Sequence, residues 1–312
     1  MRRAVVLMNL GGPDSLDAVR PFLYNLFSDP AIIGLPAPLR LPLAWLIAQQ
    51  RGRVAADIYR HLGGASPLLA NTEAQARALE AVLGAGHRCF IAMRYWHPLT
   101  AAAVAEVKAW QPEDIVCLPL YPQYSVTTTG SSLAAWRAAA LKAALACPTR
   151  EIASYPTLPG FVAALAASIG EVLDRVGDGA VRLLLSAHGL PMKIVRAGDP
   201  YPNQIGETAA ATVAALGRRG LDWRVCYQSR VGPLAWLGPS VADEVRQAGK
   251  DRVPVVMAPI SFVSEHSETL VELDRDYRRL AEQSGVPAYY RAPTVSTDPR
   301  FIAGLAELVG VR

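Results

Sequence analysis

His188 ends a run of apolar residues, LLLSAHGLP, and its type and position suit chemistry. Gly189 and Pro191 follow at once, and they predict a sharp turn that directs the imidazole away from the core. A second apolar run, VVMAPISF, is followed by His266 and Glu268. If both runs are parallel strands, their carboxyl ends lie at one edge of a sheet and bring the imidazoles and the carboxylate together. Such a group can exchange protons or bind a metal ion.

Three acidic residues recur at every fourth position: Glu268, Glu272 and Asp276. At about 3.6 residues per turn, a helix would place them in one stripe, where like charges repel. Two interpretations follow. The stripe is a solvated face with Arg275 and Arg278 as counter-ions, or it is a buried row that carries protons or metal ions. Spacing by itself favours the solvated face.

Apolar runs alternate with amphipathic stretches along the whole chain, and this alternation predicts an α/β fold with parallel sheets. We expect strands at 4–10, 88–93, 115–120, 150–154, 181–187, 224–228, 253–260 and 288–291. We expect helices at 15–27, 72–83, 100–110, 131–145, 160–176, 203–216, 239–248, 267–283 and 300–309. The length favours two four-stranded halves around a cleft over one large sheet.

The composition excludes several classes of protein. With 312 residues, 51% hydrophobic and 19% charged, the chain is neither disordered nor fibrous. Its net charge of +4 comes without a long basic run, which argues against a general nucleic-acid binder. The four cysteines form no CxxC pair, and the sequence has no GxxxxGK[ST], GxGxxG, HExxH or GxSxG motif. The TTTGSS segment at 127–132 predicts a helix start, which is either an N-cap or an anion site.

No stretch approaches the roughly 20 apolar residues of a membrane span, and the first apolar run is too short for a signal peptide. The nearest candidate is the segment 32–47, IIGLPAPLRLPLAWLI, which we call the lip segment. Its prolines at positions 36, 38 and 42 argue against a single regular helix. We therefore expect exposed apolar side chains among Ile33, Leu35, Leu39, Leu43 and Trp45, which would mark a binding surface unless the segment only covers the core.

The chain resembles the ferrochelatase family over nearly its whole length. The resemblance rests on these segments, in order: LMNLGGPDS, GGASP, MRYWHPLT, LYPQYSVTTTGSSL, LSAHGLPMKIVRAGDPYP, YQSRVGPLAWLGPS and MAPISFVSEHSETLVELD. It implies insertion of Fe²⁺ into protoporphyrin IX with release of two protons, the step that yields protohaem at the end of haem biosynthesis. It also implies two Rossmann-like halves, each a mainly four-stranded parallel sheet flanked by helices, with a porphyrin cleft between or above them. We expect the first half at 1–120 plus 290–312 and the second, with His188 and Glu268, at 121–289.

The resemblance assigns catalytic and metal-binding roles to His188 and Glu268, on opposite faces of the porphyrin. A neutral imidazole, with an ordinary pKa of about 6.5, can either ligate the metal or accept a pyrrole proton. His266, Glu272 and Asp276 match the family's path for protons or metal, which favours the buried row. In the family, the helix that carries Glu268 is often widened into a π-turn.

The remaining implied residues bind the porphyrin. Propionate groups would lie near Arg51, Tyr59, Ser66 and Ser229, and aromatic contacts would come from Trp236 and Phe262. The full set is Leu10, Arg51, Tyr59, Ser66, Arg94, Tyr95, Tyr121, Tyr201, Ser229, Trp236 and Phe262.

Some members carry a cysteine-rich C-terminal extension that ligates a [2Fe–2S] cluster, together with an internal cysteine. Val126 occupies that internal position and the sequence ends at Arg312, so we expect no cluster and no required cofactor. Leu10 and Gly189 replace a Met and a Ser that other members have, and neither change alters a reacting group.

Two other functions remain open. One is a chelatase for another tetrapyrrole, such as coproporphyrin III or a cobalt or nickel precursor. The other is a non-catalytic haem or porphyrin carrier, which would need an axial ligand but not Glu268 with its acidic row. We expect a cytoplasmic protein with peripheral contact at the inner face of the membrane through residues 32–47. It would receive its porphyrin from the membrane or from the preceding enzyme.

Overall fold

The computed structural model describes residues 2–177, 179–230, 232 and 234–310. The chain forms two compact units, Met1–Ser154 with Leu305–Arg312, and Tyr155–Gly304. The division differs from the expected bounds at 120 and 290. Residues 121–154 belong to the first unit because Leu133 and Trp136 pack into the same core as the strand residues Val6 and Ile115.

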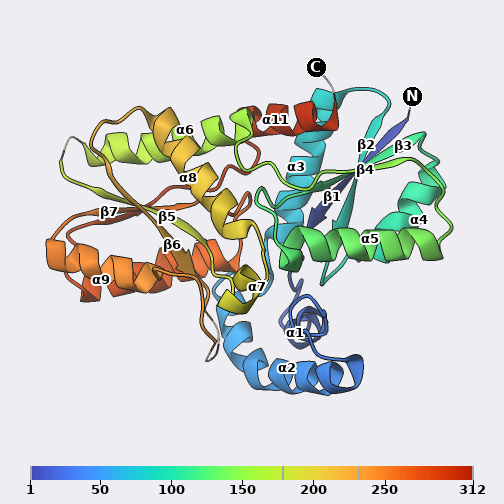
Figure 1. Cartoon of the computed structure of the whole chain (residues 1–312), viewed down its shortest axis with the longest axis horizontal. Coiled ribbons are helices and arrows are strands. Elements are labelled where there is room, and N and C mark those ends of the chain that lie inside the picture. Colours follow the sequence, from blue (N-terminus) through green and yellow to red (C-terminus); the bar gives the residue numbers. More distant parts are fainter. Residues whose placement is uncertain (1, 178, 231, 233, 311–312) are drawn as a thin grey trace. The chain divides into compact units, whose positions relative to one another are not determined.

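The first unit contains a four-stranded parallel sheet in the order β2-β1-β3-β4 (Figure 1). Its strands are β1 Arg3–Asn9, β2 His87–Met93, β3 Asp114–Pro119 and β4 Thr149–Glu151. Its helices are α1 Val19–Phe27, α2 Ala37–Arg60, α3 Leu68–Leu83, α4 Thr100–Trp110, η1 Val126–Gly130 and α5 Ser131–Lys142. The central strand β1 is buried along almost its whole length, as expected for a strand covered on both faces.

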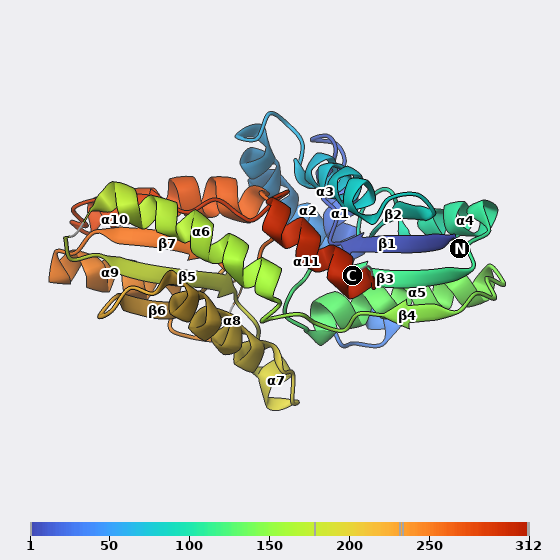
Figure 2. The same cartoon turned by 90° about the horizontal axis from the view of Figure 1, so that it is seen from above.

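The second unit repeats this arrangement, with a parallel sheet in the order β6-β5-β7-β8. Its strands are β5 Arg182–His188, β6 Asp222–Gln228, β7 Val255–Pro259 and β8 Tyr289–Arg291. Its helices are α6 Pro159–Val176, α7 Met192–Arg196, α8 Tyr201–Leu216, α9 Val241–Asp251, η2 Glu268–Tyr277 and α10 Arg278–Gln283. The last helix, α11 Pro299–Val309, begins in the second unit and ends in the first. Figure 2 shows α6 beside β5 and β7, and one face of this sheet packs its apolar side chains against α9 and η2.

The fold class is therefore confirmed, and every expected strand is present with ends shifted by a few residues. The segment after β3 starts a helix as predicted, and the Ser125 hydroxyl caps it by accepting a hydrogen bond from the Thr127 amide. η1 and η2 are π-helices, so the widened turn that the resemblance implied at Glu268 is present. The short helix α7 was not predicted.

The expectation of a broken lip segment was wrong. α2 runs without interruption from Ala37 to Arg60 and contains Pro42. The prolines are tolerated because Pro38 lies in the first turn, where the amide has no helical partner, and Pro42 removes only one further bond. Leu39 is 62% exposed and Trp45 57% exposed, and Leu35 and Leu43 are exposed as well, so the predicted apolar surface exists. Among the described residues, no helix is both long enough and apolar enough to cross a bilayer.

Candidate active site

The site of the second unit lies at the carboxyl ends of its strands. His188 is the last residue of β5, Gln228 is the last of β6, and Glu268 begins η2 after β7. Gly189 turns the chain closely against β6, because a Cβ atom there would lie 2.8 Å from the Gln228 carbonyl oxygen. A larger residue at this position would push the backbone away from β6. The glycine therefore fixes the direction in which His188 leaves the strand.

The Glu268 carboxylate lies between two imidazoles. His188 Nε2 is 3.6 Å from Glu268 Oε1, and His266 Nε2 is 3.7 Å from Glu268 Oε2. The ends of two strands therefore bring these three side chains together, as the sequence predicted. His188 keeps 41% of its side-chain surface exposed, whereas His266 keeps 12%, so His188 is the more open to a substrate. Within the described residues, no three His, Cys, Asp or Glu side chains already form a metal-binding group.

His188 is fixed by its neighbours in one orientation. Its Nδ1 lies 2.6 Å from the Gly189 carbonyl oxygen, which leaves Nε2 to face Glu268. Its backbone amide donates to Ser261 Oγ, and its carbonyl accepts from the Tyr201 hydroxyl. Phe262 contacts the imidazole edge-on, with ring centres 6.5 Å apart. The site therefore presents one defined nitrogen.

Two predicted porphyrin-binding aromatics thus support the histidines in this structure. The Tyr201 side chain is buried and its hydroxyl is bonded to the His188 backbone. Phe262 also lies against His266, with ring centres 4.5 Å apart. Trp236 is half-buried close to the same turn, because a Cβ added to Gly189 would lie 3.2 Å from its ring.

The charges of the site change the expected protonation of His188. Burial alone would lower its pKa, but the Glu268 carboxylate and the Gly189 carbonyl outweigh burial and raise the pKa to about 9. Burial likewise disfavours a charged Glu268, yet His188 and His266 hold the pKa of that carboxyl well below its usual range. At neutral pH the resting pair is an imidazolium and a carboxylate, and not the neutral imidazole expected from the ordinary pKa.

Glu272 is held by several hydrogen-bond donors. Its carboxylate accepts from the Ser229 amide at 2.9 Å, from Ser229 Oγ at 2.6 Å and from Gln228 Nε2 at 3.0 Å. Burial and the neighbouring charge of Glu268 nevertheless raise its pKa above the ordinary value. Ser229, which we expected near a propionate, is thus engaged with Glu272, and its φ of 60° is the left-handed conformation that non-glycine residues rarely adopt.

Asp276, the third acid of the row, is exposed to solvent. The exposure of the acidic row is therefore mixed: Glu268 and Glu272 are partly buried, and Asp276 is solvated. The widened π-turns contribute to this result, because their spacing differs from that of the α-helix assumed for the stripe. A role of the row in carrying protons or metal ions stays a prediction.

The other predicted residues lie in the first unit. Leu10, Tyr59 and Tyr95 belong to an apolar cluster that α1 and α2 also build. Arg51 is exposed and stacks over the Phe27 ring at 5.9 Å. Ser66 accepts from the Leu68 amide, and Tyr121 has its hydroxyl buried.

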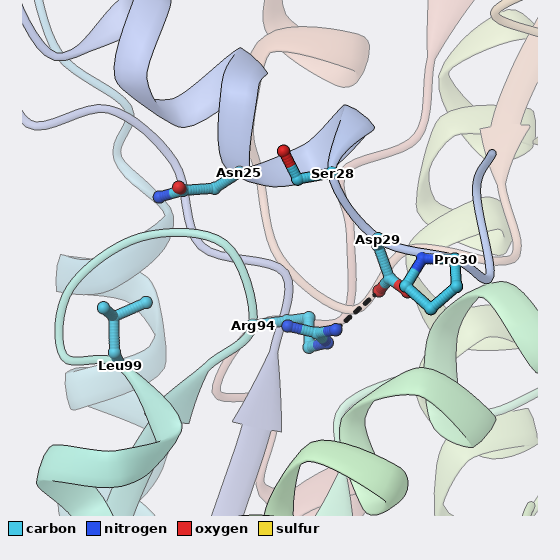
Figure 3. A pocket seen from close by; sticks show the side chains of 6 residues that line it. All are labelled: Asn25, Ser28, Asp29, Pro30, Arg94 and Leu99. Carbon is cyan, nitrogen blue, oxygen red and sulfur yellow. Dashed lines mark hydrogen bonds and ion pairs between the residues drawn. The ribbon is translucent and has the colours of Figure 1, made fainter. Parts of the chain in front are cut away.

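Arg94 is bound to a residue that sequence analysis missed. Its Nη2 donates to the buried Asp29 carboxylate at 2.7 Å (Figure 3). Its Nε donates to Ser131 Oγ, also at 2.7 Å. Tyr95 Oη and Ser131 Oγ donate to the same carboxylate, and together these donors hold the pKa of Asp29 below its usual value although burial opposes this. Arg94 and Asp29 also line a cavity of about 260 Å³. An isolated acid after an apolar helix, in NLFSDP, was the available signal.

Known ferrochelatases match this chain over nearly its full length. The family model described as Ferrochelatase matches residues 2–312. A ferrochelatase of Caulobacter vibrioides is 53% identical and one of Phenylobacterium zucineum is 54% identical, each covering 98% of this chain and 89% and 90% of its own length. A ferrochelatase of Wolbachia is 47% identical and covers 99% of this chain and 98% of its own.

Solved structures show the same fold at low sequence identity. SirB from Bacillus subtilis with Fe³⁺ has a TM-score of 0.60 at 10% identity and covers 99% of this chain and 94% of its own. A sirohydrochlorin chelatase SirB in complex with cobalt has a TM-score of 0.57, also at 10% identity, and covers 98% of this chain and 93% of its own. These likenesses concern the fold alone.

Proposed function

The chain belongs to the ferrochelatase family, whose reaction is metal insertion into a porphyrin, and from that premise we propose that it inserts Fe²⁺ into protoporphyrin IX to form protohaem. Two pyrrole protons leave the macrocycle in this reaction. The site must therefore supply a base and a ligand for the incoming metal.

The observation that carries the proposal is the Glu268 carboxylate between two imidazoles, with Glu272 behind it. A carboxylate that stays ionised at neutral pH can accept a pyrrole proton. Glu272, with its raised pKa, is a better proton acceptor than an ordinary carboxylate and lies next to Glu268. A proton that reaches Glu272 continues towards solvent along η2, where Asp276 is exposed.

His188 acts as the metal ligand in this proposal. Its Nε2 carries a proton in the resting pair, and a metal ion binds only the neutral imidazole. The Nε2 proton is therefore released to solvent as Fe²⁺ binds, and the positive charge of the metal replaces the imidazolium charge beside Glu268. His188 regains a proton when the metal passes to the porphyrin, so the net release remains the two pyrrole protons. The orientation that Gly189 and Ser261 impose on His188 keeps Nε2 available for this exchange.

Two features support protoporphyrin over the more highly charged coproporphyrin. The lip segment contains a single cationic residue, Arg40, and its guanidinium already donates to the Ser28 and Leu35 carbonyls. The surrounding surface consists of exposed leucines and Trp45. An apolar surface of this kind fits a sparingly soluble dicarboxylate porphyrin that arrives from a membrane or from the preceding enzyme.

Insertion of Zn²⁺ followed by fluorescence tests the function in one assay. We expect turnover with protoporphyrin IX and much slower turnover with coproporphyrin III at equal concentration. Faster turnover with coproporphyrin would transfer the proposal to that substrate. Stoichiometric binding of porphyrin without turnover would make the protein a carrier and overturn the proposal.

A further inference from the structure

Gln228 connects both acids of the site and has no assigned role. It is fully buried at the end of β6, the edge strand of the second sheet. Its Nε2 donates to the Glu268 backbone carbonyl at 3.0 Å and to Glu272 Oε2 at 3.0 Å. Its Oε1 accepts from Ser186 Oγ at 2.7 Å. One amide thus joins strand β5, strand β6 and helix η2.

The three contacts fix the orientation of the amide. Both partners on the helix side are acceptors, so the NH₂ group must face them, and the Ser186 hydroxyl holds the carbonyl oxygen on the opposite side. A glutamate would bring a third carboxyl towards Glu272, and a methionine would leave all three partners without this contact. Among side chains of this length, glutamine alone offers two donors at one end with an acceptor beside them.

The bond to the Glu268 carbonyl lies at the first residue of the π-helix. A side chain that hydrogen-bonds into the backbone ladder of a helix distorts the helix locally. Gln228 therefore stabilises the turn that carries Glu268. The same amide holds the Glu272 carboxylate, so the positions of the two acids are coupled through one side chain.

We infer that Gln228 is a positioning residue for metal insertion, which holds Glu272 within reach of Glu268 and supports the widened turn. The inference rests on the roles proposed above for these two acids. In this inference, Ser186 fixes the orientation of the Gln228 amide through its hydrogen bond to Gln228 Oε1.

The test is Gln228→Met, with steady-state kinetics of Zn²⁺ insertion as the readout. Loss of a residue that orients a reacting group typically lowers activity about 10- to 100-fold. We expect such a fall in kcat with the KM for porphyrin unchanged, because Gln228 is fully buried and its amide nitrogen contacts the two glutamates. Gln75→Met is the matched control: Gln75 is equally buried but lies on α3 in the first unit, and this variant should keep the wild-type kcat.

A double variant separates this inference from the proposed function. In a Glu272→Gln background, Gln228→Met should lower kcat much less than in the wild type, because the main partner is already altered. An equal loss in both backgrounds, or a wild-type kcat in Gln228→Met, would overturn the positioning role. A wild-type kcat in Glu272→Gln would overturn the role proposed for Glu272, and the inference with it.

Ser186→Ala keeps the test decisive if Gln228→Met does not fold. Removing one neutral hydrogen bond should lower kcat about fivefold, since such a bond contributes about 1 kcal/mol. An unchanged kcat in Ser186→Ala would contradict the proposed anchoring of the amide.

Discussion

The protonation of His188 depends on one neighbour, and this dependence can be measured. In the wild type, the pKa of His188 is raised to about 9, with the Glu268 carboxylate as the main cause opposing burial. The Glu268→Gln substitution removes that charge and keeps the shape of the side chain. Burial, which lowers the pKa of His188, would then be opposed by less negative charge. The pKa of His188 should therefore fall to the ordinary value of about 6.5 or below.

The expected change in population is large. At pH 7 a group with a pKa of about 9 is neutral in about 1% of molecules, whereas a group with a pKa of about 6.5 is neutral in about three quarters. The sign is fixed by the direction of the shift. A raised pKa keeps the imidazolium up to higher pH, so the variant should lose the His188 proton at lower pH than the wild type.

Nuclear magnetic resonance of protein with ¹⁵N-labelled histidine measures this directly. The chain has five histidines, and a His188→Asn variant assigns the resonance. We expect a wild-type titration near pH 9 and a shift of about two units or more to lower pH in Glu268→Gln. A wild-type pKa at or below 6.5, or an equal pKa in both proteins, would refute the electrostatic argument. His266→Ala is a suitable control, because His266 faces the other oxygen of the carboxylate and should leave the His188 titration well above 6.5.

Four further predictions follow from the site and its surroundings. His188→Ala should abolish Zn²⁺ insertion while circular dichroism and thermal unfolding show a folded protein; substantial remaining turnover would exclude His188 from the mechanism. Asp29→Asn should destabilise the protein by about 3 kcal/mol at pH 7 in urea unfolding, as for a broken buried ion pair. Because the pKa of Asp29 is lowered in the folded state, the difference from wild type should begin to shrink as the pH falls below the ordinary value of 3.8 and should vanish only below the lowered pKa of the folded protein; a difference that stays constant over this range would contradict this cause. Replacing Leu39 and Leu43 by Ser should raise the KM for protoporphyrin and weaken liposome binding with little change in maximal turnover, and an unchanged KM would remove the lip segment from substrate access. Purified protein should contain no acid-labile sulfide, and a stoichiometric amount would contradict the absence of a cluster.

Local patterns in the sequence were sufficient for the strands and for the centre of the site, but not for helices α2 and α7. The apolar runs before His188 and before Glu268 predicted two strands, and the rule for parallel sheets placed both side chains at one edge. By contrast, proline counts misled at α2, because Pro36 precedes the helix, Pro38 lies in its first turn where no amide bond is lost, and Pro42 removes only one bond of a 24-residue helix. The helix remains continuous because the prolines lie near its start, whatever their number.

The residues that sequence analysis missed have partners far away in the chain, and the spacing of residues in a sequence does not show which distant side chains meet. Asp29 binds Arg94, and Gln228 binds Ser186 and Glu272, across distances of many tens of residues in the chain. The pKa of His188 was missed for the same reason, since it depends on how close Glu268 comes in the folded unit. Such properties require the tertiary structure.

A comparison of the two units supports the proposed location of the chemistry in the second unit. Both sheets have the same strand order, and in both the third strand ends in proline and leads into a π-helix. Thr129 and Thr269 lie equally far after these prolines, and both are fully buried. At the positions where the second unit has Glu268 and Glu272, the first has Thr128 and Ser132. The backbone arrangement therefore recurs without the acids, so the strand order and the π-turn do not by themselves specify a metal-inserting site. The second unit differs in its two histidines, in its two carboxylates and in the Gln228 amide that is bonded to the Glu272 carboxylate and to the Glu268 backbone.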